Sequence, residues 1–65
     1  MNLKEIRTKR NMSQKALAEA IGVTQGAVSA WEVGFWTPTI ENLKQLAVVL
    51  NCTVDELLAD PKEER

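Results

Sequence analysis

Apolar residues recur three or four positions apart in five successive stretches of this 65-residue chain. This spacing is typical of helices that bury one face and leave the other in water. No stretch shows the sustained alternation of a strand, so the pattern predicts an all-α chain with five short helices. The expected inward-facing positions are Leu3, Ile6, Leu17, Ala18, Ile21, Val28, Trp31, Ile40, Leu43, Leu46, Ala47, Leu50, Val54, Leu57 and Leu58.

Polar residues mark where each helix is expected to begin and end. Five residues whose side-chain oxygen can cap a first turn precede the apolar stretches: Asn2, Ser13, Thr24, Thr39 and Thr53. Four residues of types that tolerate a left-handed conformation follow them: Asn11, Gly22, Gly34 and Asn51. Glu5 and Glu56 stand three residues after Asn2 and Thr53, the spacing at which a glutamate reaches back to the cap.

The segment from Ser13 to Glu32 joins two of these helices through a tight turn at Gly22. Val23 and Val28 are spaced so that an apolar residue before the cap packs on the fourth helical residue and sets the direction of the following helix. Two helices joined in this way form the unit that DNA-binding proteins use to place their second helix in the major groove.

The outward face of the second helix of this unit is small and uncharged. A helical projection places five residues there: Gln25, Gly26, Ser29, Ala30 and Val33. A glutamine can bond both groups of an adenine edge, and an alanine can touch a thymine methyl. Gln14, in the first turn of the preceding helix, is placed to engage a phosphate or a nearby base. The alternative is an ordinary solvated helix surface, although such surfaces usually carry Glu and Lys.

Charge is segregated along the chain despite a formal net charge of −1. Residues 1–31 hold five basic and two acidic side chains, a net charge of +3, whereas residues 32–65 carry a net charge of −4. The basic half contains the candidate reading unit. This distribution is consistent with a polyanionic partner, or with a solvated surface whose charges are uneven.

Composition excludes several kinds of site. Cys52 is the single cysteine and there is no histidine, so neither an intramolecular disulfide nor a zinc cluster can form. An enzyme is not expected, because the chain has no glycine-rich phosphate loop and no carboxylate cluster in a sequence long enough to form a pocket. We expect no cofactor, metal or small-molecule ligand. No apolar run approaches the roughly 18 residues of a membrane span and no signal peptide is evident, so a cytoplasmic protein is expected.

Over residues 3–58 the chain resembles the Cro/C1-type helix-turn-helix family, also called the Xre family of bacterial and phage transcriptional regulators. The residues that carry the resemblance are the Ser13-Gln14 start, the Leu17, Ala18 and Gly22 core, the Trp31-Glu32 pair, Pro38, and the end Asp55-Glu56-Leu57-Leu58. The resemblance implies a compact five-helix, lambda-repressor-like DNA-binding domain over residues 1–60, followed by a charged tail at residues 61–65. It also implies binding to double-stranded operator DNA, commonly as a homodimer.

The resemblance assigns roles to individual positions of this sequence. Base contacts are expected from Gln25, Gly26, Ser29 and Ala30. Contacts to the DNA backbone are expected from Gln14, Thr24, Thr37, Thr39 and Asn42. Arg7 and Glu32 occupy the positions of a partly buried ion pair between the first and third helices, and we expect this pair to orient helices rather than to bind DNA.

Phe35 and Trp36 depart from the family, which usually has a basic or polar pair after the glycine that corresponds to Gly34. Three interpretations are open. Phe35 can fold back on the fourth helix while Trp36 covers the linker; the pair can form an interface with a protein; or it can contact sugars or thymine methyls. Val33 likewise replaces a common asparagine. Cys52 is expected to be a small core residue rather than a reactive thiol.

These observations favour a sequence-specific transcriptional regulator, a repressor that occludes a promoter by placing the helix over residues 24–32 in the major groove. A useful degree of specificity suggests a dimer on a two-fold operator. The alternative function is a protein-interaction module, an antagonist or adaptor, that uses Phe35 and Trp36 on the same scaffold.

Overall fold

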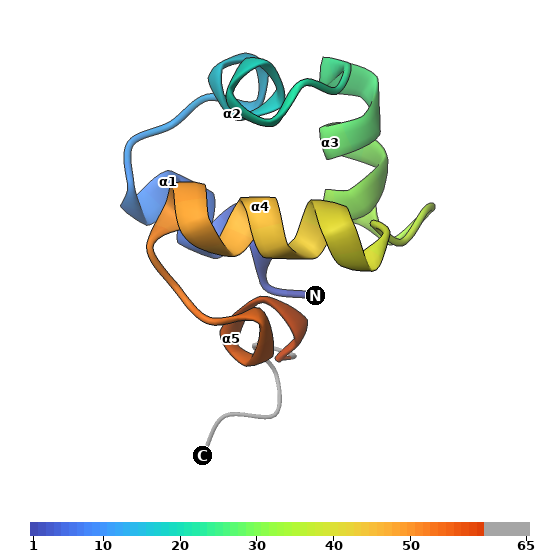
Figure 1. Ribbon diagram of the computed structural model, residues 1–65. Helices are drawn as coiled ribbons and strands as arrows, with labels where there is room; N and C mark the ends of the chain where they lie inside the picture. Colours follow the sequence, from blue (N-terminus) through green and yellow to red (C-terminus); the bar gives the residue numbers. More distant parts are fainter. Residues whose placement is uncertain (60–65) are drawn as a thin grey trace.

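A computed structural model describes residues 1–59 of the chain, and these residues form five helices without a strand (Figure 1). The helices are α1 (Leu3–Lys9), α2 (Gln14–Ile21), α3 (Gln25–Val33), α4 (Ile40–Leu50) and α5 (Val54–Leu58). The predicted all-α, five-helix fold is therefore confirmed. The expected domain boundary at residue 60 and the charged tail at residues 61–65 lie outside the described residues.

Four of the five expected caps are present. The side chains of Ser13, Thr24 and Thr39 each accept a hydrogen bond from the backbone N–H three residues later, at 2.9 to 3.1 Å. Thr53 and Glu56 form the full reciprocal box, with bonds of 3.0 and 2.8 Å. All four residues expected in the left-handed conformation have a positive φ: Asn11, Gly22, Gly34 and Asn51.

Asn2 begins α1 but does not cap it, which corrects the expectation from its spacing to Glu5. Its side chain accepts no bond from the first turn, and its Oδ1 is buried without a hydrogen-bond partner among the described residues. The backbone N–H of Asn2, from which Glu5 would accept in a reciprocal cap, donates instead to the carbonyl oxygen of Leu57 in α5 at 2.8 Å. This bond joins the first and last helices, and Asn2, with φ −102° and ψ 27°, lies outside the extended conformation that a capping residue usually adopts.

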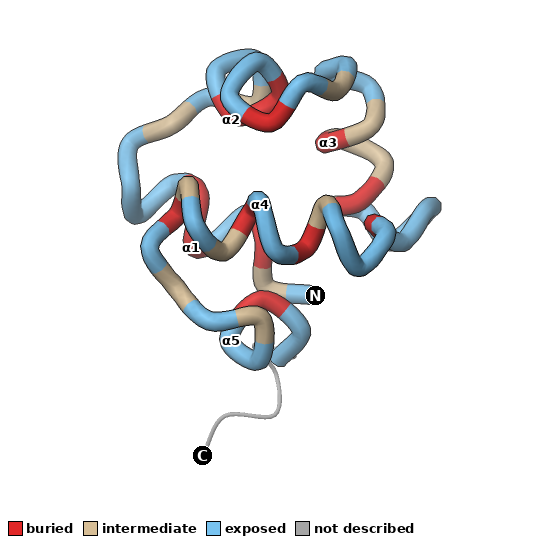
Figure 2. The backbone as a smooth tube through the Cα atoms, viewed as in Figure 1, coloured by how far each residue is buried: buried red, intermediate tan, exposed pale blue. Residues whose placement is uncertain are grey.

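The core lies where the inner faces of the helices meet around α4, which crosses the middle of the molecule (Figures 1 and 2). The helix α4 packs against α2 and α5, and α2 packs against α3. Six side chains are completely or almost completely buried: Leu3, Leu17, Val28, Leu46, Leu50 and Leu57. Arg10 links the end of α1 to the end of α4, because its side chain donates to the carbonyl oxygens of Leu50 and Asn51, at 2.6 and 3.1 Å.

Two positions of the predicted apolar pattern are not in the core. Ile40 is 72% exposed and Leu58 is 51% exposed. Ile40 is the first residue of α4 and Leu58 is the last residue of α5. Helical spacing gives the direction of a side chain, but burial also requires another element on that side, and no element within residues 1–59 covers these ends.

Candidate nucleic-acid interface

The turn between α2 and α3 holds the two helices in a fixed relation. Gly22 ends α2 with φ 76° and ψ 32°, and the N–H of Val23 donates to the carbonyl oxygen of Ala18 at 3.0 Å. Thr24 then caps α3, whose inner side is anchored by Val28 and Trp31, 0% and 5% exposed. The packing of one face thus determines which face of α3 is left for a partner.

The outward face of α3 is open at its first turn and partly covered further along. Gln25 and Gly26 are exposed, whereas Ser29 and Ala30 are half-buried, although the helical projection placed all four on one outward face. A Cβ built on Gly26 would meet only the Oγ1 of Thr24 within 4 Å, at 3.9 Å. The fold therefore does not require a glycine at this position, and its small size matters only for something that approaches from outside.

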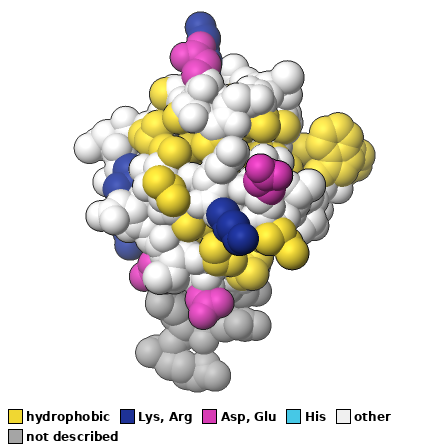
Figure 3. Space-filling view, viewed as in Figure 1, with side chains coloured by type: hydrophobic (Ala, Val, Ile, Leu, Met, Phe, Trp, Pro, Cys, Tyr) yellow, Lys and Arg dark blue, Asp and Glu magenta, His cyan; other side chains and the backbone are white. Residues whose placement is uncertain are grey.

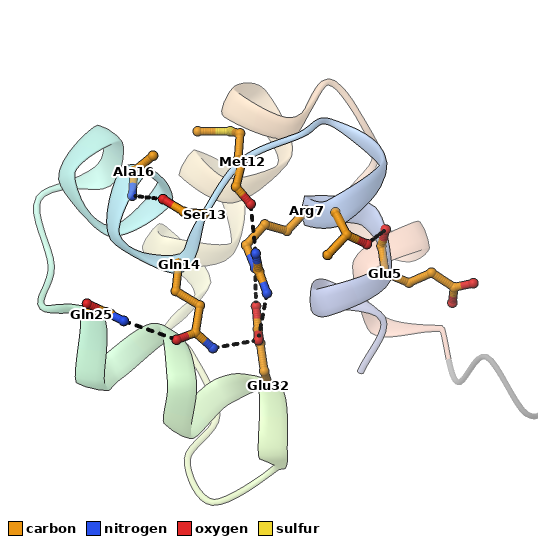
Figure 4. A network of polar contacts seen from close by, with 9 residues as sticks. Glu5, Arg7, Met12, Ser13, Gln14, Ala16, Gln25 and Glu32 are labelled. Atoms are coloured by element: carbon orange, nitrogen blue, oxygen red, sulfur yellow. Dashed lines mark hydrogen bonds and ion pairs between the residues drawn. The ribbon is translucent and has the colours of Figure 1, made fainter.

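A buried ion pair lies directly behind this face (Figure 4). The Nε of Arg7 is 2.5 Å from Oε2 of Glu32, and Nη2 of Arg7 donates to Oε1 of Glu32 at 3.3 Å. A third nitrogen of Arg7, Nη1, donates to the carbonyl oxygen of Met12 at 2.7 Å. The two side chains are 9% and 3% exposed, so the pair links α1, the chain before α2, and α3 away from solvent.

Gln14 and Gln25 extend this ion pair toward the surface. Gln14 donates through Nε2 to Oε1 of Glu32 at 2.9 Å, and Gln25 donates through Nε2 to Oε1 of Gln14 at 3.4 Å. Figure 4 shows the resulting row of side chains from Arg7 through Glu32 and Gln14 to Gln25. All four residues are candidates from the sequence, but their spacing does not link the two glutamines to the ion pair, because residues 11 and 18 positions apart meet only through the packing of α2 on α3.

Four of the five candidate backbone contacts lie at or just before the first turn of a helix, and Thr37 lies in the linker between α3 and α4. Gln14 is the first residue of α2, and the hydroxyl oxygens of Thr24 and Thr39 accept the cap bonds of α3 and α4, which leaves each hydroxyl hydrogen free to donate. Thr37 is exposed and Asn42 is half-buried. None of these residues is basic, so phosphate contacts here would come from neutral donors and helix N-termini.

Four exposed hydrophobic residues lie from the last residue of α3 to the first residue of α4. Val33, Phe35, Trp36 and Ile40 are 77, 75, 59 and 72% exposed, and we call them the 33–40 strip. The rings of Phe35 and Trp36 lie 5.8 Å apart. Figure 1 shows the loop after α3 projecting from the body of the molecule, and Figure 3 shows a hydrophobic side chain protruding at the same edge.

The exposure of Phe35 and Trp36 corrects one of the three interpretations of the pair, in which Phe35 packs on α4 and Trp36 covers the linker. The N–H groups of both residues donate to the carbonyl oxygen of Ala30, at 2.8 and 3.3 Å. Together with Gly34 at φ 82°, these bonds hold both residues in the turn that ends α3, where their side chains stay exposed. The interface and DNA-contact interpretations remain as hypotheses.

Cys52 lies between α4 and α5, half-buried against the core. Burial raises the pKa of its thiol above the usual 9.0, and the negative charge of Glu56 adds to this effect. A raised pKa reduces the thiolate fraction and hence reactivity, as expected for a packing residue. Within residues 1–59, no group of side chains is arranged to hold a metal ion, and no helix has the length and apolarity that a membrane span requires.

Comparison with known proteins identifies the family. The Helix-turn-helix family matches residues 3–57. The chain is 40% identical over 57 residues to the HTH-type transcriptional activator BcrR of Enterococcus faecalis, which covers 88% of this chain and 28% of the relative. It is 33% identical over 63 residues to the HTH-type transcriptional regulator AnsR of Bacillus subtilis, covering 97% of this chain and 54% of the relative.

A third relative is the cryptic phage CTXphi transcriptional repressor RstR of Vibrio cholerae, 29% identical over 58 residues, which cover 89% of this chain and 52% of the relative. The chain thus spans about half or less of the length of these relatives. They are named as transcriptional regulators, in agreement with the expectation that this chain is not an enzyme. With a match over most of its length and the α2–α3 geometry described above, the chain belongs to the helix-turn-helix family of Cro/C1 type.

Proposed function

We propose that this protein is a sequence-specific regulator that binds double-stranded DNA with α3 in the major groove. The observation that carries the proposal is the first turn of α3, which is exposed, uncharged and small, and which bears a glutamine whose amide bonds to the side chain of Gln14. An ordinary solvated helix surface would not need a glycine at Gly26.

Each residue of this face has a distinct role in the proposal. Gln25 bonds an adenine edge through its amide, and Gly26 lets the backbone approach the base edges. Ser29 and Ala30 are half-buried, so they meet only groups that protrude into the groove, such as a thymine methyl for Ala30. Gln14, Thr24, Thr37, Thr39 and Asn42 position the domain on the phosphate backbone.

The absence of Lys and Arg among these contacts has a measurable consequence. Arg7 and Arg10 belong to residues 1–31, the basic half, but both side chains bond to protein groups. Each basic phosphate contact adds about 0.9 to the slope of log K against log salt for B-DNA. Binding should therefore weaken with salt less steeply than for a protein that makes the 6 to 10 ionic contacts of a typical strong binder.

Homodimer formation through the 33–40 strip completes the proposal. The segment from Val33 to Ile40 contains no charged residue, and interface cores are depleted of charge and enriched in aromatic residues. With each aromatic contributing about 150–250 Å² when buried, the strip offers several hundred Å² of apolar area. This is a large part of the roughly 800 Å² that each partner buries in a specific interface.

A dimer joined at the C-terminal ends of α3 would read two half-sites, about one helical turn apart. A complex that occupies both half-sites would compete with RNA polymerase for a promoter that overlaps them. We therefore propose that the protein acts in the cytoplasm as a repressor by occlusion.

Fluorescence anisotropy with DNA selected from a random library by the purified protein tests the DNA-binding proposal. Gln25→Ala should reduce the preference for selected over scrambled DNA by about 1 to 3 kcal/mol. Gln14→Ala should, in addition to any loss of preference, lower the affinity for the selected and the scrambled DNA alike. Gln45→Ala changes an exposed glutamine of α4 and serves as the matched control with no effect. Absence of any preferred sequence at low salt, with the protein folded, would refute the proposal.

Sedimentation of the free protein at several concentrations tests the dimer. The double variant Phe35→Thr/Trp36→Thr should weaken self-association about tenfold or more, while Val48→Thr, which alters an 80% exposed side chain of α4, should not. Equal association of the two variants would place the interface elsewhere.

The exposed strip also supports the second candidate function, a protein-interaction module. That function would be favoured by a folded monomer that has no DNA preference and binds a partner protein through Phe35 and Trp36.

A further inference from the structure

The orientation of the Gln14 side-chain amide is set by Glu32. A carboxylate only accepts hydrogen bonds, so the end of Gln14 that lies 2.9 Å from Oε1 of Glu32 must be its NH₂ group. The opposite orientation would place two acceptors against each other in a site where Glu32 is 3% exposed. The bonds from Arg7 to both carboxylate oxygens of Glu32 hold that carboxylate in position.

The orientation of Gln14 in turn constrains Gln25. With its NH₂ group toward Glu32, Gln14 presents its carbonyl oxygen to Gln25, which must therefore donate through Nε2, at 3.4 Å. This leaves Oε1 and the second N–H of Gln25 without a partner in residues 1–59. The order in which Gln25 presents an acceptor and a donor to the outside is then fixed from within the protein.

We infer that Glu32 is a positioning residue for base specificity. Its carboxylate orients the side-chain amide of Gln14, and this amide in turn orients that of Gln25, so that Gln25 presents its acceptor and donor to a base in one fixed order. This inference rests on the proposed DNA-binding function and on the assignment of Gln25 to a base. The available pair matches adenine, whose N6 donates and whose N7 accepts. In the reversed orientation both contacts would be repulsive.

A purely structural role of Glu32 makes a different prediction. If Glu32 only holds α1 and α3 together, its loss lowers the folded fraction and reduces binding to every DNA by the same factor. If Glu32 orients Gln25, its loss changes the ratio of affinities for two DNAs that differ at one base. The affinity ratio is independent of the folded fraction, so it separates the two roles.

The first test compares binding to the selected operator with binding to the same operator in which 7-deazaadenine, which lacks N7, replaces the adenine whose recognition is lost in Gln25→Ala. Glu32→Gln is nearly isosteric, and its amide can accept or donate, so it no longer fixes Gln14. We expect the affinity ratio of the two DNAs to fall about threefold to tenfold. Gln14→Ala should produce a similar fall, and the double variant should produce no more.

Arg10→Met is the matched control. It removes the two bonds to the carbonyl oxygens of Leu50 and Asn51 and so lowers the stability, but it leaves Arg7, Glu32 and Gln14 in place, so the affinity ratio should stay as in the wild type. A wild-type ratio in Glu32→Gln, or an equal loss in Arg10→Met, would overturn the inference.

The second test needs no DNA. In a ¹⁵N-labelled sample, the side-chain NH₂ signals of Gln14, identified by their loss in Gln14→Ala, should include one proton shifted downfield and protected from exchange. Protection should be lost in Glu32→Gln and kept in Arg10→Met. Unprotected signals in the wild type would refute the orienting contact itself. Protected signals in a protein without sequence preference would instead refute the proposed function, and with it the role of Glu32 in specificity.

Discussion

At the first turn of α3, the Gln25 amide is linked through Gln14 and Glu32 to an arginine in the interior, whereas beyond its last turn the Phe35 and Trp36 side chains are mostly in solvent. Neither of these two sites contains a charged residue, and the helix is capped at both ends, by the side chain of Thr24 at its start and by Gly34 in the left-handed conformation at its end. They differ in whether the side chains themselves are ordered by the protein.

This difference teaches what each end can do. Polar groups that are held in one arrangement can discriminate between hydrogen-bonding patterns, because a mismatched partner leaves them unpaired. An apolar strip has no such directionality, and it gains free energy from any complementary surface that removes it from water. The two ends of one short helix are thus suited to reading and to association.

The largest expected effect is on the buried network. Glu32→Ala leaves Arg7 without its carboxylate and Gln14 without its acceptor, which should lower the free energy of unfolding by about 3 kcal/mol. The double replacement Arg7→Met plus Glu32→Leu removes both charges and should cost less, because no buried charge is left unpaired. Urea unfolding measures both, and equal or reversed midpoints would show that the network is not what holds this end of α3.

An intermediate effect, with opposite signs for folding and binding, is expected at Gly26. Gly26→Ala should raise the free energy of unfolding by up to about 1 kcal/mol, because alanine favours a helix and its Cβ meets no close neighbour. The same methyl should lower affinity for the selected DNA about tenfold by blocking close approach. Gly34→Ala is the contrasting variant, since φ 82° makes it destabilising. Unchanged DNA affinity in a more stable Gly26→Ala protein would remove Gly26 from the interface.

The smallest effect is expected at the aromatic pair. Phe35→Thr/Trp36→Thr should change the free energy of unfolding by no more than about 0.5 kcal/mol at low protein concentration, because these side chains are mostly exposed. At higher concentration the wild-type midpoint should rise, as association stabilises the folded state, and that of the variant should not. A large loss at low concentration would mean that the pair packs on the domain in solution.

Local interactions made much of the fold predictable. The caps at Ser13, Thr24, Thr39 and Thr53, and the turns at Gly22 and Gly34, join residues at most six positions apart. Such bonds depend on residue type and spacing, so they can be read directly. Asn2 shows the limit of this approach, because its spacing to Glu5 predicts a cap, whereas its backbone N–H bonds to Leu57, 55 positions away.

The candidate site also has features that could be predicted from the sequence and features that depend on tertiary packing. Sequence determined which side chains α3 carries, that Gly26 is small, and that Arg7 and Glu32 occupy the positions of an ion pair in the family that the chain resembles. Only the tertiary structure decided that Gln14 bonds to Glu32 across the α2–α3 contact, and that Phe35, Trp36 and Ile40 are left uncovered. The physical reason is that a hydrogen bond between distant residues, or the burial of an apolar side chain, depends on where a second element lies, which the spacing within one element does not encode.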